Sequence, residues 1–308
     1  MTYSERRKAI VMIAAVWTIA LILAPLQFAE ISEQSPPPPV EPRIPIPANE
    51  KLVFEVRFSR FPLNVSVGQI TFEYLGQVSN PTIAGSNYAL SPREGETFVG
   101  LRANVQSQGV LISLLGLSYN GRYETLIKRD NLFAALSFKE EKDDKKKHIT
   151  QTSLFDVLSG KIRYATRNLA NPSEPARILE LPLRDRTQSM LSAFYYVRLM
   201  PLKEDQVNCF FVSQDEQTVD LEVFFRGREV IEVNRQKIMA IRIEPKVFGP
   251  GRYFARRQGD FQLWMTDDER RLPLKLVAKT TQGTISANLI NYLEQPPFRQ
   301  MGPSGSVK

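Results

Sequence analysis

Apolar and polar side chains alternate with a period of two along most of the chain after residue 50. Leu52, Phe54 and Val56 fall on one face of an extended segment, while Lys51 and Glu55 fall on the other. The segments that repeat this pattern are 70–74, 99–105, 132–138, 219–225, 261–265, 274–278 and 285–289. Such alternation is typical of half-buried antiparallel strands, with one face packed and the other in water.

Short turn signals separate these segments and predict hairpins rather than crossover helices. They are Asn80-Pro81, Tyr119-Asn120-Gly121, Ser159-Gly160, Phe225-Arg226-Gly227 and Gln282-Gly283. The spacing accommodates about ten to twelve strands, and a sheet of that size curls or closes because it is strongly twisted. The predicted fold class is mainly β, a single large curved antiparallel sheet or half-open barrel over residues 51–294. One or two helices are expected to pack on it, and residues 295–308 are expected to form a flexible tail.

Residues 185–200 break the period of two and predict a helix. Asp185 is suited to cap its first turn, and Gln188 occupies the capping-box position. Its apolar stripe consists of Met190, Leu191, Phe194, Tyr195 and Leu199. We expect this helix, over residues 187–199, to pack on the sheet, because an apolar stripe usually faces the core. The alternative is a plug or gate over a cavity inside the curved sheet.

The amino terminus has the pattern of an export signal. Residues 1–8 form a basic flank, and residues 9–29 form an apolar run that carries no charge. About 20 residues are enough to span a bilayer as a helix. Gln27 and Ile22 stand where signal peptidase requires a small residue, so a retained anchor is favoured over a cleaved signal peptide. By the positive-inside rule the rest of the chain lies outside the cytoplasm.

Residues 30–50 are predicted to form a stalk. Seven of the thirteen residues from Ser35 to Pro47 are proline. Such a segment adopts a stiff polyproline II conformation that rises about 3.1 Å per residue. The simpler interpretation is a spacer that lifts a domain off a membrane, and the alternative is a ligand for a proline-binding domain.

Three motifs in the body of the chain occur in a familiar order. They are the hairpin segment 67–72, the helix segment 188–198, and the segment Leu263–Lys275, which continues through residues 283–289. Together they resemble a bacterial envelope family known as domain of unknown function 3108, with agreement from about residue 51 to 293. One departure is Gln188, which stands where the family's helix motif often carries Asp.

The resemblance implies export to the bacterial envelope and brings no established activity, so it implies no catalytic residues. With the amino terminus, it predicts a single-pass protein of the inner membrane whose carboxy-terminal domain lies in the periplasm. The alternative is a soluble periplasmic or external protein after signal cleavage.

Composition and charge narrow the chemistry further. The 308 residues include 40 Lys and Arg against 33 Asp and Glu, which gives a net charge of +7. A single Cys excludes an intramolecular disulfide framework, and a single His excludes zinc sites and triads that need several imidazoles. No metal and no cofactor are predicted. Export removes nucleic acid as a partner, although the chain is basic.

Four charged or reactive groups need an interpretation. Arg252, Arg256 and Arg257 flank aromatic side chains in one segment, and their guanidinium forks suit phosphates. The charge-dense segment 139–148, which ends at His148, is predicted to be a solvated hairpin tip. Cys209 is expected to be a buried inert thiol, and residues 267–269 a charged turn. The predicted ligand- or partner-binding residues are Arg252, Tyr253, Arg256, Arg257, Met190, Phe194 and Tyr195.

These features predict a non-enzymatic envelope protein that binds an apolar or amphipathic ligand, such as a lipid, on the concave face of its sheet. The alternative is an assembly scaffold that binds a partner envelope protein through a sheet edge or a basic loop. An envelope hydrolase is the third possibility, and it would require a polar cluster with perturbed pKa values in a cleft.

Overall fold

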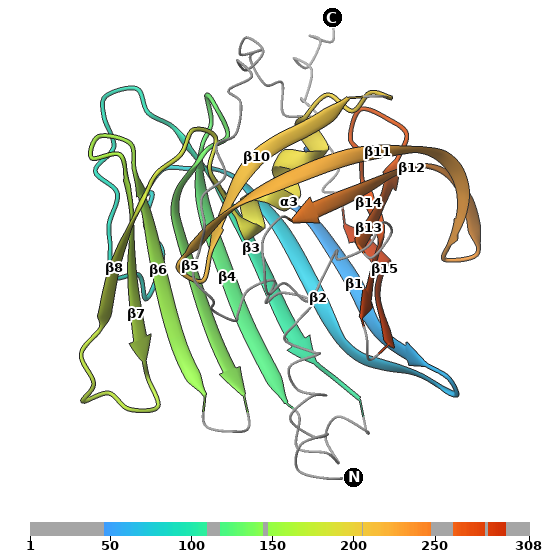
Figure 1. The fold of residues 1–308 in the computed structure, drawn as a ribbon, viewed down its shortest axis with the longest axis horizontal. Coiled ribbons are helices and arrows are strands. Elements are labelled where there is room, and N and C mark those ends of the chain that lie inside the picture. Colours follow the sequence, from blue (N-terminus) through green and yellow to red (C-terminus); the bar gives the residue numbers. More distant parts are fainter. Residues whose placement is uncertain are drawn as a thin grey trace, which may run out of the picture.

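One large curved sheet forms the described part of the protein (Figure 1). The computed structural model describes residues 46–109, 118–143, 147–204, 206–247, 261–280 and 283–293. The predicted anchor, most of the predicted stalk and the predicted tail lie outside these residues. Within the described residues, no helix is both long enough and apolar enough to span a membrane.

Within the described residues the sheet has fifteen strands, more than the ten to twelve expected from the sequence. The strands are β1 (Glu50–Arg60), β2 (Leu63–Val78), β3 (Phe98–Ser107), β4 (Tyr119–Lys128), β5 (Ala134–Asp143), β6 (His148–Asp156), β7 (Lys161–Asn168), β8 (Arg177–Pro182), β9 (Gln188–Ser189), β10 (Val207–Gln214), β11 (Gln217–Val233), β12 (Gln236–Val247), β13 (Phe261–Thr266), β14 (Pro273–Thr280) and β15 (Gly283–Leu293). Their order is β8-β7-β6-β5-β4-β3-β2-β1-β15-β14-β13-β12-β11-β10-β9. All neighbours pair antiparallel except β9 and β10, which are parallel. The prediction of a single, large, curved and mainly antiparallel sheet is confirmed.

Helix α3 (Met190–Leu199) lies between the two halves of the curved sheet. On one side Leu191 and Tyr195 join a core formed mainly by β1–β4, β14 and β15, with single residues of β11, β12 and β13. On the other side Ala193 and Val197 pack with apolar side chains of β10–β13. The helix is therefore buried on most of its circumference, because each half of the sheet needs an apolar surface to cover its inner face.

The predicted start of this helix was wrong. Asp185 lies in an exposed turn, and Gln188 belongs to the short strand β9. The capping box is instead made by Ser189, whose hydroxyl accepts from the backbone N–H of Ser192 at 3.1 Å. Pairing of Gln188 with Val212 of β10 holds the chain extended up to this point, and the helix begins only beyond it.

Two glycines read as turn signals lie inside strands. Gly121 belongs to β4, where a Cβ atom would lie 2.7 Å from a ring atom of Tyr123, so glycine permits a close approach of side chains. Gly227 has a φ of 110° and forms a bulge in β11, at which the register with β12 shifts. The predicted turns at these positions were wrong, whereas the turn at Ser159-Gly160 does join β6 to β7.

A buried ion pair fastens α3 to the first strand. The Arg198 guanidinium donates to both carboxylate oxygens of Glu50, at 2.6 and 2.9 Å, and both side chains are 0% exposed. The same guanidinium also donates to the backbone carbonyl of Arg270 at 3.2 Å. This pair fixes the last turn of the helix against the start of β1.

Candidate functional site

The helix residues predicted to bind a ligand contribute to the protein core. Phe194 stacks on Phe72 of β2 with ring centroids 4.2 Å apart, and Tyr195 lies 6.0 Å from the ring of Tyr74. Met190 is half-buried and packs against both apolar clusters. The concave face beside β1–β4 is therefore filled by α3. Ligand binding by these three residues stays a prediction.

The other predicted binding residues are Arg252, Tyr253, Arg256 and Arg257. They lie between β12 and β13 in sequence and fall outside the described residues.

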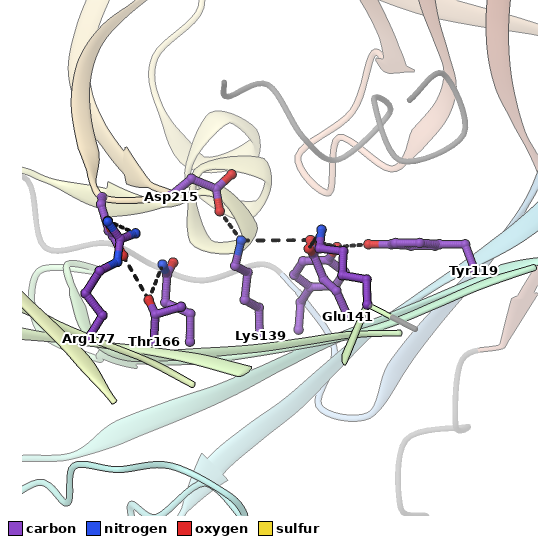
Figure 2. Close-up of polar contacts among 10 residues, drawn as sticks. Tyr119, Lys139, Glu141, Thr166, Arg177 and Asp215 are labelled. Atoms are coloured by element: carbon purple, nitrogen blue, oxygen red, sulfur yellow. Dashed lines mark hydrogen bonds and ion pairs between the residues drawn. The ribbon is translucent and has the colours of Figure 1, made fainter. Parts of the chain in front are cut away.

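A buried charged cluster, which the sequence analysis missed, lies where the β10–β11 hairpin crosses the inner face of β4–β7 (Figures 1 and 2). Lys139 of β5 forms an ion pair with Asp215 at the hairpin tip. Its Nζ atom also lies 3.9 Å from Glu141 on the same strand. The exposed fractions of the Lys139, Asp215 and Glu141 side chains are 11%, 6% and 2%.

Hydrogen bonds extend this cluster across four strands. Tyr123 of β4 donates to Glu141 at 3.0 Å, and Tyr119 lies 2.6 Å from the Tyr123 hydroxyl. On the far side, Thr166 of β7 donates to Glu216 at 2.9 Å, and Glu216 also pairs with Arg177 of β8. Figure 2 shows the resulting row of polar contacts from Tyr119 to Arg177.

The charges in the cluster perturb one another's proton affinities. Burial alone would lower the pKa of Lys139, but the carboxylates of Asp215 and Glu141 raise it above its ordinary value. Burial alone would raise the pKa of Glu141, but Lys139 and Lys147 lower it. For Asp215, burial outweighs the attraction of Lys139 and raises the pKa.

The hairpin tip has an unusual sequence for its backbone. Asp215 and Glu216 have φ values of 49° and 61°, which is the left-handed region. A two-residue hairpin loop of this kind prefers Asn-Gly, because other residues pay a steric cost there. The acidic side chains at these two positions hold the tip against β5, β7 and β8, which offsets that cost.

These contacts hold the two ends of the open sheet together. In the described chain, β8 and β9 are the edges of the sheet and have no strand pairing between them. Side chains bridge the gap instead: Tyr164 of β7 bonds Ser213 of β10, and Thr125 of β4 lies 2.9 Å from Ser189 of β9. The cluster therefore helps to hold the two ends of the open curved sheet together.

A pocket of about 470 Å³ opens at the carboxy-terminal end of α3. Its apolar wall consists of Leu199, Leu202, Phe225 and Ile241. Charged side chains of both signs form the rest of its lining, which includes Arg228, Arg271, Asp267 and Asp268. The volume falls in the usual range of small-molecule sites, but six of the ten lining residues are charged, so the pocket is more polar than most such sites.

Pairing fixes the geometry of this rim. The Arg228 Nε donates to Asp267 at 2.8 Å, and the guanidinium lies 5.3 Å from the Phe225 ring centroid. Arg271 donates to the carbonyls of Arg198 and Met200, so it caps the end of α3. The Asp268 carboxylate accepts from the backbone N–H groups of Arg270 and Arg271 at 3.1 and 3.0 Å. These bonds hold the turn between β13 and β14 against the helix.

The remaining candidate groups had mixed outcomes. The charged turn predicted at residues 267–269 is confirmed, since it joins β13 to β14. Cys209 is exposed rather than buried, because Phe210 and Val212 take the inward positions of β10. Burial of part of its side chain, together with Asp220 and Glu222, raises its pKa.

The segment 139–148 was predicted to be a solvated hairpin tip, but residues 139–143 belong to β5 and two of their charged side chains are buried, while residues 144–146 lie outside the described residues. Glu140 points outward and its carboxylate lies 2.9 Å from the Nε2 of His148. Lys139 and Glu141, on alternate positions, point into the cluster. The even-numbered apolar residues of β5, Leu136 and Phe138, pack on the other face under Ile83.

Within the described residues, no group of three or more His, Cys, Asp or Glu side chains is placed to hold a metal ion.

Comparison with known proteins identifies the family. Among solved structures, one match is the crystal structure of a beta-barrel-like protein of domain of unknown function DUF1849 from Brucella abortus. It shares 9% sequence identity and a TM-score of 0.45, and the match covers 81% of this chain and 98% of that one. No curated protein matches the chain. The model of the family described as "Protein of unknown function (DUF3108)" matches residues 94–290, a range that contains the helix and carboxy-terminal motifs but not the hairpin at 67–72. The chain therefore belongs to the DUF3108 family.

Proposed function

We propose that this protein is a non-enzymatic binding protein of the bacterial envelope that holds an amphipathic ligand in the pocket at the end of α3. The observation that carries the proposal is the combination of an apolar wall and a charged rim in a pocket of about 470 Å³. In this proposal residues 9–29 anchor the protein in the inner membrane, and residues 30–50 lift the sheet into the periplasm.

The structure favours this pocket over the concave face as the binding position. The side chains of α3 pack into the concave face, where the ring of Phe194 stacks on that of Phe72. At the end of the helix, Leu199 and Leu202 are only half-buried and face the pocket. An acyl chain would cover these apolar atoms, and its head group would meet Arg228 and Asp267 at the rim.

The charged cluster is the feature that would support a hydrolase, but its geometry favours a structural role. Lys139, Glu141 and Asp215 are nearly inaccessible, and each forms an ion pair within the cluster. A catalytic acid or base has to reach its substrate directly or through one water molecule.

Photo-crosslinking tests the proposal. The full chain is illuminated with a photoactivatable lysophospholipid, and labelled peptides are identified by mass spectrometry. We expect labels around residues 199–202 and 225–228. Leu202→Trp should fill the pocket and remove them, whereas Ile178→Trp, at an exposed position of β8, should not. Labels scattered over the surface, or an unchanged pattern in Leu202→Trp, would contradict ligand binding in this pocket.

A further inference from the structure

The tip of the β1–β2 hairpin carries two large apolar side chains into solvent. Phe61 is 99% exposed and Leu63 is 52% exposed, although most large apolar residues of this sheet are buried. Pairing of Arg60 with Leu63 makes the tip a tight hairpin, which holds both side chains outward. In Figure 1 this hairpin projects at the lower right of the sheet.

The hairpin extends beyond both of its neighbours. On one side the pairing of β2 with β3 ends at Gly68, and on the other the pairing of β1 with β15 ends at Ser59. Within the described residues, positions 60–64 therefore pair only inside their own hairpin. Nothing in the described structure covers Phe61.

The charge around the tip is positive. No Asp or Glu occurs between residues 56 and 72. Arg60 is exposed and has no carboxylate partner in the described structure. The same is true of Lys279 on β14. It lies near the tip because it pairs with Thr284 of β15, which in turn pairs with Ser59 of β1. Arg57 is the exception, because it pairs with Glu55 at 3.3 Å.

We propose that this tip inserts into the surface of an anionic lipid bilayer, with Phe61 and Leu63 among the acyl chains and Arg60 at the phosphates. Aromatic and basic side chains are the groups that settle at membrane interfaces. Two apolar side chains are too few for a stable protein interface, which needs about 800 Å² from each partner. A lipid surface requires no matching shape, so a small protruding tip is sufficient.

This contact would be separate from the predicted anchor. The chain enters β1 at Glu50, and the tip lies at the opposite end of that strand. Eleven residues of strand span about 36 Å at about 3.3 Å each. The tip therefore reports on lipid contact by the folded domain itself, at the end of β1 opposite Glu50.

Quenching of tryptophan fluorescence by brominated lipid tests the proposal in the full chain. Trp17 is replaced by Phe, and Trp264 is buried in the core, so a new tryptophan supplies the lipid-sensitive signal. Phe61→Trp places it at the tip. Leu158→Trp is the matched control, because Leu158 is 79% exposed in the turn between β6 and β7 but its backbone N–H donates to the carboxylate of Asp156 at 3.0 Å.

In vesicles that contain brominated phosphatidylglycerol we expect strong quenching at position 61 and little at position 158. Adding Arg60→Gln, or replacing the anionic lipid by brominated phosphatidylcholine, should reduce the quenching at position 61. Equal quenching at positions 61 and 158, or none at 61, would overturn the proposal.

Discussion

Removing the positive charge at the centre of the buried cluster should weaken the contact between β5 and the β10–β11 hairpin. In Lys139→Met the Asp215 and Glu141 carboxylates lose the cation between them while both remain buried. Glu141 keeps its bond from Lys147 at 2.8 Å, but Asp215 keeps no cation in the described structure. Deleting one partner of a buried pair typically costs about 3–5 kcal/mol, because the other charge stays desolvated.

The matched control is Lys51→Met. Lys51 pairs with Glu73 at 3.0 Å, but its side chain is 42% exposed, so water screens the pair and replaces it readily. Loss of an exposed pair costs about 0–1 kcal/mol. The two substitutions are chemically identical, and the difference between them isolates the effect of burial.

Urea unfolding monitored by circular dichroism measures both losses, and hydrogen exchange locates them. We expect Lys139→Met to lower the free energy of unfolding by about 2–5 kcal/mol more than Lys51→Met does. Exchange should accelerate first at the β10–β11 hairpin around residues 213–217. Equal losses of unfolding free energy in the two variants, or unchanged hydrogen exchange at the hairpin, would refute the view that the cluster holds the two ends of the open sheet together.

Three further predictions follow from single positions. Folding lowers the pKa of Glu141, so its contribution to stability is present above its ordinary pKa and is lost as the pH falls through the folded value. Glu141→Gln should therefore flatten the fall in the free energy of unfolding between about pH 5 and 3. Gly68→Ala places a Cβ atom 2.5 Å from the Gln106 carbonyl oxygen, whereas in Gly100→Ala the nearest atoms belong to side chains, the closest at 3.1 Å. Urea unfolding should therefore show a loss of unfolding free energy about 1–3 kcal/mol larger for Gly68→Ala. Cys209 should react with a maleimide in the folded chain, but more slowly at pH 7 than a free model thiol, because its pKa is raised.

Local patterns in the sequence were sufficient for most of the strands. The alternation at 99–105 and 285–289 corresponds to β3 and β15, because each strand there has one face in the core and the other in water. The pattern could not distinguish a glycine that turns the chain from one that makes space. At Gly121 the space serves the neighbouring tyrosines, and only the three-dimensional packing reveals it.

The charged cluster could not be predicted because its members are far apart in sequence. Lys139 and Asp215 are separated by 76 residues, and each lies in a segment that resembles an exposed turn. The start of α3 was missed for a related reason, since the pairing of Gln188 with Val212 is also long-range. The pocket likewise combines the end of α3 with a turn from residues 267–271, two elements that are adjacent only in the folded sheet.

Native mass spectrometry of the full chain, purified from the envelope of an expressing bacterium, tests the central claim most directly. Spectra are recorded before and after solvent extraction, and Leu202→Trp is treated in parallel. The account predicts a reproducible extra mass of an amphipathic compound on the wild-type chain, which extraction removes and which Leu202→Trp lacks. A bare polypeptide mass in the wild type, with no uptake of added phospholipid, would contradict the claim that the pocket holds a ligand.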